Sequence, residues 1–160
     1  MSLELKKVDN HNIWEIIQLS VSDEQKGFVA TNTVSILEAY TTITAGGIAL
    51  PFGIYDDKTP VGFLMIGYGC EDWEDAPAIA HGTYSIWRFM IDKRYQNKGY
   101  GKKTMEATLS YIKTFPCGES KYCWLSYNPE NWVAKKLYQE YGFEENGEWD
   151  GNEVIAVLEL

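Results

Sequence analysis

The stretch Asp92-Lys93-Arg94-Tyr95-Gln96-Asn97-Lys98-Gly99-Tyr100-Gly101-Lys102-Lys103 decides how the chain folds. Residues 83–92, which lead into it, are β-branched and aromatic and almost continuously hydrophobic, which is typical of a strand buried on both faces. Residues 99–115, which follow its turn, carry apolar side chains at spacings of four and three, and this pattern predicts a helix. The stretch is therefore a turn from a buried strand into a helix.

The turn has the chemistry of an anion site. Gly99 and Gly101 open the helix, where backbone N–H groups have no intrahelical acceptor and a ligand can approach the main chain closely. These amides and the helix dipole attract anions, so the turn predicts a diphosphate cradle. The alternative is a solvated basic turn whose glycines serve only the bend. Five of the chain's 14 basic residues lie within eleven positions here: Lys93, Arg94, Lys98, Lys102 and Lys103.

Composition narrows the class of protein. The 160 residues are 45% hydrophobic and 14% aromatic, which suits a single domain over residues 1–160 and argues against disorder. With 14 basic and 23 acidic residues, the formal net charge is −9. Polyanions are repelled by such a chain, so we expect neither a nucleic-acid nor a membrane partner, and the charge favours a neutral or cationic one.

The cysteines and the N-terminus indicate a cytoplasmic protein. Cys70, Cys117 and Cys123 are widely spaced and form no C-x-x-C pair, so we expect reduced thiols and no metal site. No signal peptide and no membrane-spanning apolar run is visible. The expected location is therefore the cytoplasm.

The remaining pattern predicts one α/β domain with a mixed sheet, in the order β-α-α-β-β-β-α-β-α-β-β. Strands are expected at 3–8, 52–55, 61–68, 83–92, 121–127, 143–149 and 154–158. Helices are expected from Asn10 or Asn12 through Val21, at 32–45, at 99–115, and from Asn131 to Gly142 with Val133, Leu137 and Tyr141 along one face. Ser35 and Glu38 match a capping box, so the second helix could begin at Asn32 or at Ser35.

Two motifs make the chain recognisable. Gln96-Asn97-Lys98-Gly99-Tyr100-Gly101 matches the Q/R-x-x-G-x-G/A pattern of the GCN5-related N-acetyltransferase (GNAT) superfamily. The later Asn131-x-x-Ala134-x-x-Leu137-Tyr138-x-x-x-Gly142-Phe143 resembles that family's second block. The resemblance covers essentially the whole chain and is strongest to bacterial spermine/spermidine (diamine) acetyltransferases. It implies a mixed sheet that splays between its fourth and fifth strands.

The resemblance also implies a reaction and a cofactor site. Acetyl would pass from acetyl-coenzyme A to a primary amine by direct attack in a ternary complex. The backbone of Phe89, Met90 and Ile91 would bind the pantetheine arm, while Asn131 and Lys135 or Lys136 would reach the coenzyme from the later helix. The diphosphate would be held by main-chain N–H groups of Gln96, Asn97, Lys98, Gly99, Tyr100, Gly101 and Lys102.

The resemblance implies that Tyr138 is the general acid, and elementary chemistry supports that role. A departing thiolate gains from a proton donor, and a phenol with a pKa near 10 can donate while remaining protonated at pH 7. The alternative is a core tyrosine, because Tyr138 lies beside Leu137 at the edge of the apolar face.

The general base is harder to assign, because Trp87 and Arg88 stand where many polyamine acetyltransferases have Glu or Asp. An ammonium group must lose a proton before it can attack, and a carboxylate is the usual acceptor. Glu38 is our candidate, with a capping role beside Ser35 as the alternative.

The resemblance, together with the net charge of −9, implies a polyamine such as spermidine or spermine as the acceptor. A cluster of acidic and aromatic side chains could attract such a polycation and stack on its methylene chain. The alternatives are a solvated acidic loop and, for the tyrosine, core packing. The candidate residues are Glu71, Asp72, Trp73, Glu74 and Tyr84. Rival functions are acetylation of another amine (a protein N-terminus, an aminoglycoside or an amino-acid derivative) and a non-catalytic coenzyme A sensor. A homodimer is expected from the resemblance.

Overall fold

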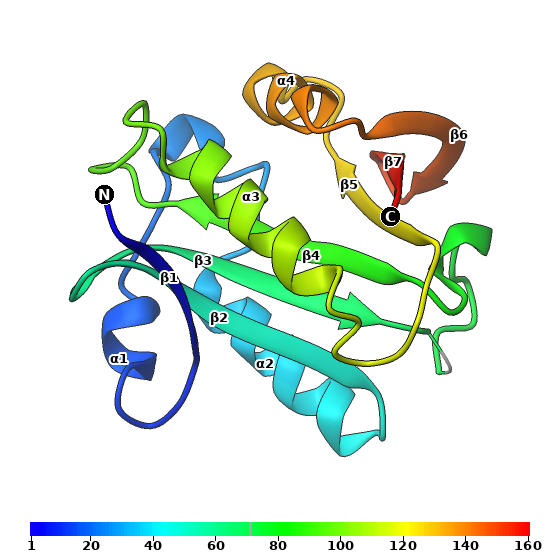
Figure 1. Cartoon of the computed structure of the whole chain (residues 1–160), viewed down its shortest axis with the longest axis horizontal. Coiled ribbons are helices and arrows are strands. Elements are labelled where there is room, and N and C mark those ends of the chain that lie inside the picture. The colour runs from blue at the N-terminus through cyan, green and yellow to red at the C-terminus, as the bar shows by residue number, and fades with distance from the viewer. Residues whose placement is uncertain (71) are drawn as a thin grey trace.

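A computed structural model describes residues 1–70 and 72–160 as a seven-stranded mixed sheet with helices on both faces (Figure 1). The strand order is β1-β2-β3-β4-β5-β7-β6. The strands are β1 Leu3–Lys7, β2 Ile48–Asp56, β3 Thr59–Tyr68, β4 Tyr84–Ile91, β5 Tyr122–Tyr127, β6 Glu144–Asp150 and β7 Glu153–Glu159. The helices are α1 Ile13–Ile16, α2 Asn32–Thr44, α3 Tyr100–Ile112 and α4 Trp132–Glu140, with short 3₁₀ turns at Asp23–Gln25 and Ala78–Ala80. The predicted α/β class and element order are confirmed.

Alternation along β3 explains why both faces of the sheet are covered. Phe63 and Met65 pack into the cluster formed with α1 and α2. Their neighbours Leu64 and Ile66 point the other way and pack into the cluster that includes α3. All four side chains are fully buried. Since successive side chains in a strand point to opposite faces, a continuously hydrophobic strand requires cover on both.

The sheet divides between β4 and β5, as predicted. In the described part of the two strands, parallel pairing is confined to Tyr84 with Cys123 and Ser85 with Trp124. Beyond these pairs the strands diverge, with β4 running toward α3 and β5 toward α4 (Figure 1). From Ile86 onward, β4 is still paired with β3, but no strand of the described residues pairs with its other edge.

A β-bulge lies where β4 leaves β5. Met65 of β3 is opposite Arg88, whereas the next residue, Ile66, is opposite Ile86. Trp87 is therefore the extra residue on β4. A bulge bends its strand and increases the local twist, so the insertion of Trp87 turns β4 away from β5 and widens the gap.

The turn after β4 is held by one buried carboxylate. Asp92, 2% exposed, accepts hydrogen bonds from the amides of Ser20 and Arg94, each at 3.0 Å. The Arg94 Nε donates to the same side chain at 2.8 Å. The turn then passes through Asn97 (φ 61°) and Gly99 (φ 87°), which caps α3. This left-handed backbone favours Asn and Gly and explains why they stand there.

The first helix differs from the prediction. The apolar spacing that suggested a helix as far as Val21 yields a single turn, and the Leu19 amide donates to the Ile16 carbonyl at 3.2 Å as the chain leaves it. Ile16, Leu19 and Val21 are nevertheless all buried. The apolar residues as far as Val21 are therefore explained by their burial, and they do not indicate a longer helix.

The predicted capping box at Ser35 and Glu38 is also wrong. The N-cap of α2 is Thr31, whose hydroxyl accepts from the Val34 amide at 3.2 Å. Ser35 lies one turn inside the helix and is fully buried, and its hydroxyl donates to the Thr31 carbonyl at 3.1 Å. Glu38 is consequently available for a tertiary contact.

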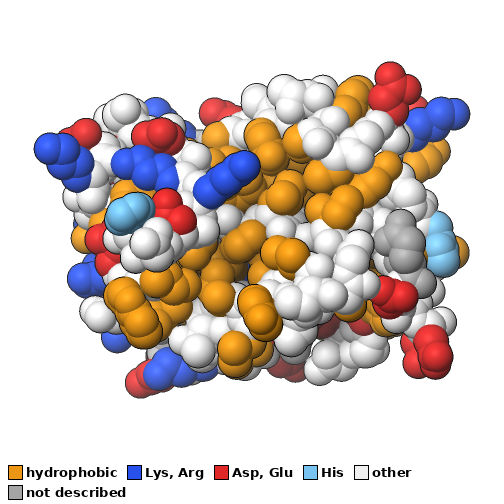
Figure 2. All heavy atoms as spheres, turned by 90° about the horizontal axis from the view of Figure 1, so that it is seen from below, with side chains coloured by type: hydrophobic (Ala, Val, Ile, Leu, Met, Phe, Trp, Pro, Cys, Tyr) orange, Lys and Arg blue, Asp and Glu red, His pale blue; other side chains and the backbone are white. Residues whose placement is uncertain are grey.

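The exposed face of α2 is unusually apolar, with Val34, Leu37, Tyr40 and Ile43 between 43% and 68% exposed. Figure 2 views the molecule from the side on which α1 and α2 lie in Figure 1, and shows hydrophobic side chains gathered across its middle.

Within the described residues, no helix combines the length and apolar character that crossing a membrane requires.

Candidate active site

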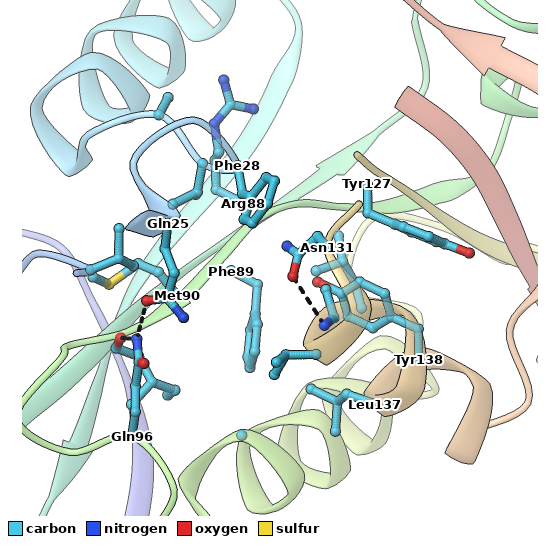
Figure 3. A pocket seen from close by; sticks show the side chains of 18 of the residues that line it. Gln25, Phe28, Arg88, Phe89, Met90, Gln96, Tyr127, Asn131, Leu137 and Tyr138 are labelled. Carbon is cyan, nitrogen blue, oxygen red and sulfur yellow. Dashed lines mark hydrogen bonds between the residues drawn. The ribbon is translucent and has the colours of Figure 1, made fainter. Parts of the chain in front are cut away.

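A cavity of about 640 Å³ occupies the gap where β4 and β5 part. Phe89 and Met90 of β4 line one wall, and Asn131, Leu137 and Tyr138 line the other. Figure 3 shows the Phe89 ring extending between the two walls and the α4 side chains opposite it. Ile91 at the end of β4 also lines the cavity. The residues expected to bind a pantetheine arm and to act on its thioester therefore share one space.

The start of α3 forms one end of this cavity and suits an anion. The first helical hydrogen bond runs from the Lys103 amide to the Gly99 carbonyl at 3.3 Å, so the amides of Tyr100, Gly101 and Lys102 have no acceptor within the helix. Among the described residues, a methyl group built on Gly99 would meet no atom within 4 Å, and one on Gly101 would meet Leu137 at 3.6 Å. The turn thus leaves open space in front of unpaired donors, which fits a diphosphate.

Part of the positive charge of this turn is neutralised inside the protein. Arg94 pairs with Asp92, and Lys102 pairs with Glu140 at 2.9 Å. The Lys98 ammonium donates to the Arg94 carbonyl at 3.1 Å. The backbone amides are therefore better placed than these side chains to carry anion binding.

Two amide side chains fix the ends of the cavity. The Gln96 Nε2 donates to the Ile91 carbonyl and to Gln25 Oε1, each at 2.9 Å, which ties the turn to β4 (Figure 3). Asn131 caps α4, with its Oδ1 accepting from the Ala134 amide at 3.3 Å. Its side-chain NH₂ group remains for a ligand. Both residues line the cavity, as does Asn97, whereas Lys98 and Lys136 are not among its described lining residues.

Tyr138 is buried in the wall of the cavity, 8% exposed, with its ring against Tyr127 (centroids 5.7 Å apart) and Phe143 (6.1 Å). No hydrogen bond joins its hydroxyl to the described part of the chain. Burial raises the pKa of Tyr138 well above its usual value, and the negative charge of Glu153 raises it further. The phenol therefore stays protonated at neutral pH and is suited to donate a proton.

The predicted apolar face of α4 was wrong at Val133, which is 73% exposed, while Tyr138 is the buried residue of that helix.

A second cavity, of about 430 Å³, lies on the other side of Arg88 and extends toward the ends of α2 and β3. It combines aromatic rings with carboxylates. The rings are those of Tyr68, Trp73, Trp87 and Trp124, and the carboxylates are Asp72, Asp150 and Glu153. Trp73 stacks on Trp124 with the ring planes 28° apart. The arrangement suits a flexible cation with a hydrocarbon backbone.

The two cavities meet at five described residues that line both of them: Ile86, Trp87, Arg88, Ser126 and Glu153. Glu153 is the carboxylate of this shared set. The Ser126 hydroxyl donates to Glu153 Oε1 at 2.9 Å. Burial raises the pKa of Glu153, and the charge of Asp150 raises it further, while Ser126 and Arg88 act in the opposite direction.

Glu38, the sequence-based candidate for the base, is bound by Arg88. One guanidinium nitrogen of Arg88 donates to both carboxylate oxygens, at 3.0 and 3.2 Å. Among the described residues Glu38 lines neither cavity. Its position orients Arg88 toward the junction rather than presenting a carboxylate to an acceptor.

The acceptor residues expected from the sequence divide between several locations. Asp72 and Trp73 line the second cavity, Glu74 is exposed outside it, and Glu71 lies outside the described residues. Tyr84 was misplaced by the sequence argument, since it is fully buried and lines neither cavity. Its hydroxyl donates to the Gly118 carbonyl at 2.7 Å, so it anchors the loop before β5.

Asp150 and Glu153 line the second cavity but were not among the residues predicted from the sequence. In the sequence they flank a Gly-Asn turn and indicate only a hairpin. Since β7 lies between β5 and β6, this hairpin is carried to the junction of the cavities. Only the strand order reveals that, although an acidic residue on each side of the turn was a visible signal. In the described part of the chain, no three His, Cys, Asp or Glu side chains lie close enough together to hold a metal ion.

Comparison with known proteins agrees with this geometry. A model of the acetyltransferase (GNAT) family matches residues 13–143. The chain is 35% identical over 162 aligned residues to the spermine/spermidine N(1)-acetyltransferase of Bacillus subtilis strain 168, with both chains covered completely. A probable spermine N(1)-acetyltransferase of Bacillus subtilis subsp. natto matches equally, at 35% over the full length of both chains.

Solved structures share the fold. An aminoglycoside acetyltransferase AAC(6')-Ib in complex with coenzyme A superimposes with a TM-score of 0.76 at 19% identity, over 99% of this chain and 95% of that one. A spermidine N-acetyltransferase from Vibrio cholerae in complex with coenzyme A and spermine gives 0.69 at 17% identity, over 98% and 93%. The family match, the full-length relatives and the splayed sheet lead to one conclusion: this chain belongs to the GNAT family and is an acetyl-coenzyme A-dependent N-acetyltransferase.

Proposed function

We propose that the protein acetylates a primary amine of a polyamine, with spermidine or spermine as the preferred acceptor, by direct attack in a ternary complex. The observation that carries this proposal is the second cavity, in which Asp72, Asp150 and Glu153 lie among four aromatic rings. A polyamine carries several ammonium groups at neutral pH, separated by methylene chains. Carboxylates attract the former, and indole rings bind both.

Two further observations support a polycationic acceptor. The whole chain carries a formal charge of −9, which raises the local concentration of cations by long-range attraction. The Bacillus relatives, 35% identical over their full length, are named for spermine and spermidine acetylation.

On the cofactor side, acetyl-coenzyme A supplies the acetyl thioester. We propose that the amides of Tyr100, Gly101 and Lys102 bind its diphosphate and that the exposed edge of β4 binds its pantetheine arm. Asn131 offers its side-chain NH₂ group from the opposite wall. Tyr138 would then donate its hydroxyl proton to the sulfur as the thiolate departs.

The test is a panel of amines assayed for acetyl-dependent thiol release under identical conditions. We expect kcat/KM for spermidine and spermine to exceed that for short alkyl monoamines, kanamycin and a peptide N-terminus by at least about tenfold. A tenfold ratio corresponds to about 1.4 kcal/mol in transition-state binding. Faster turnover of an aminoglycoside or a peptide would replace the polyamine by that class. Tight coenzyme A binding by calorimetry without transfer to any amine would instead favour a sensor.

A further inference from the structure

We infer that Glu153 is the general base that removes a proton from the acceptor ammonium group. The inference rests on the amine-acetylating part of the proposed function and holds for whichever amine the panel selects. It assigns the base to β7, on the side of the gap opposite β4, rather than to Glu38.

The position of Glu153 carries the inference. An acceptor must enter from one cavity and meet the thioester in the other, so its nitrogen reacts where the two cavities join. Of the described residues that line both cavities, Glu153 is the one that bears a carboxylate. Asp72 and Asp150 line only the acceptor side, and Glu38 lines neither. Glu153 also lies close enough to Tyr138 for its charge to act on that phenol.

The carboxylate of Glu153 is half fixed and half available. Its Oε1 accepts the Ser126 hydroxyl hydrogen bond at 2.9 Å, which holds the side chain in place. Its Oε2 forms no hydrogen bond with the described part of the chain, so this oxygen can receive a proton directly or through a water molecule. Ser126 thus acts as a positioning residue for Glu153.

Charged and polar groups from four elements surround Glu153. Arg88 approaches from β4, Asp150 from β6 and the Tyr138 phenol from α4, while Ser126 contacts it from β5. Burial and the charge of Asp150 raise the pKa of Glu153 above its ordinary value, and the hydrogen bond from Ser126 and the charge of Arg88 limit that rise. Glu38 contributes indirectly, because it binds Arg88.

The step balances as follows. The acceptor R–NH₃⁺ gives one proton to Glu153, and the resulting amine uses its lone pair to form a C–N bond to the thioester carbonyl carbon. The C–S bond then breaks, and the sulfur takes the Tyr138 proton. The nitrogen releases its second proton, which returns Tyr138 to the phenol form, and Glu153 loses its proton to solvent. The products are the amide, the free thiol and one H⁺.

The experiment compares Glu153→Gln with Glu159→Gln, a control at the far, exposed end of the same strand. Glutamine retains an acceptor for Ser126 but cannot take a proton. We expect E153Q to lower kcat at pH 7 by about 10²–10⁴-fold. Its rate should then rise steadily toward pH 10, following the fraction of free amine, whereas wild type and E159Q reach a plateau earlier. Glu153→Asp should recover part of the loss.

Two other outcomes would overturn the inference. If E153Q raises KM for the polycation while kcat and the pH profile are unchanged, Glu153 is only a binding charge. If Glu38→Gln, and not E153Q, lowers kcat at pH 7 and makes the rate rise steadily toward pH 10, then the base is Glu38. Coenzyme A affinity of each variant, measured by calorimetry, shows whether the fold and the cofactor cavity are intact.

Failure of the polyamine proposal can be distinguished from failure of this one. The variants are assayed with the best acceptor from the amine panel, whatever its class. Another preferred amine with an unchanged E153Q effect would refute only the polyamine assignment. Efficient polyamine acetylation by E153Q at pH 7 would refute only the base.

Discussion

Replacing Tyr138 by phenylalanine should separate catalysis from stability. The hydroxyl makes no hydrogen bond with the described residues, and the ring contacts with Tyr127 and Phe143 involve carbon atoms that phenylalanine keeps. No partner among the described residues is left unsatisfied by the change, so the free energy of unfolding should stay within about 1 kcal/mol of wild type, or rise slightly as a buried polar atom is removed.

Turnover should fall far more than stability. Loss of a positioned general acid costs about 10²–10⁴-fold in kcat, or about 3–5 kcal/mol of transition-state stabilisation. Because burial raises the pKa of this phenol, Tyr138 should remain protonated up to at least about pH 10, the ordinary tyrosine value. The wild-type kcat should therefore not decrease below that pH through deprotonation of Tyr138. The measurements are thiol release under saturating substrates, urea unfolding and coenzyme A calorimetry.

Tyr141→Phe is the matched control, since Tyr141 follows Tyr138 by one turn and lies away from the cavity. Its hydroxyl bonds to the Lys102 carbonyl and to Glu106, each at 3.0 Å. We expect that variant to lose about 0.5–1.5 kcal/mol of stability with little change in kcat. Retention of more than a tenth of wild-type kcat by Tyr138→Phe, with Tyr141→Phe equally active, would refute the acid role.

Four further predictions follow from the site. Gly99→Ala should cost about 1 kcal/mol of stability, because an L-residue is strained at φ 87°, and should weaken coenzyme A binding measured by calorimetry. Asp92→Asn should cost about 1–3 kcal/mol at pH 7 in urea unfolding. Burial raises the pKa of Asp92, but the hydrogen bonds from Arg94 and Ser20 outweigh burial, and the pKa is lowered overall. The stability that ionised Asp92 contributes is therefore present above about pH 4 and is lost as the pH falls through the pKa of the folded state. Arg88→Gln should move the acidic limb of the rate profile to higher pH, because the guanidinium charge lowers the pKa of Glu153. Salt should reduce kcat/KM for spermine several-fold more than for a monoamine; equal effects would contradict electrostatic attraction of the polycation.

Local patterns were sufficient to predict the order of the elements. Period-2 and helical spacings depend on which side chains are buried, and the glycines and prolines mark where elements end. The same patterns misled at Ile13–Ile16, where buried residues with helical spacing belong to one turn and the irregular segment after it. They misled again at Ser35, because Thr31 made the cap and left Ser35 to be buried.

The cofactor side of the site was more predictable than the acceptor side. Phe89, Gly101, Asn131 and Tyr138 belong to continuous motifs, and all four of them line one cavity. The acceptor side is assembled from segments far apart in sequence, so no local spacing records it.

Arg88 shows why tertiary contacts were out of reach. Its partner Glu38 is 50 positions away on another element, and its neighbours Asp150 and Glu153 lie on a hairpin near the C-terminus. Only the order of strands in the sheet brings these charges together.

The brief contact between β4 and β5 makes the sheet two leaves joined at a short seam. Where β4 and β5 are not paired, an amide-bearing chain of another molecule can take the place of a strand. Its binding would then connect the two parts of the sheet. Any such occupant adds its binding free energy to the cohesion of the protein. The β5–β7 leaf should therefore exchange its backbone hydrogens more slowly whenever the seam is filled, and each release of product would loosen the two leaves again.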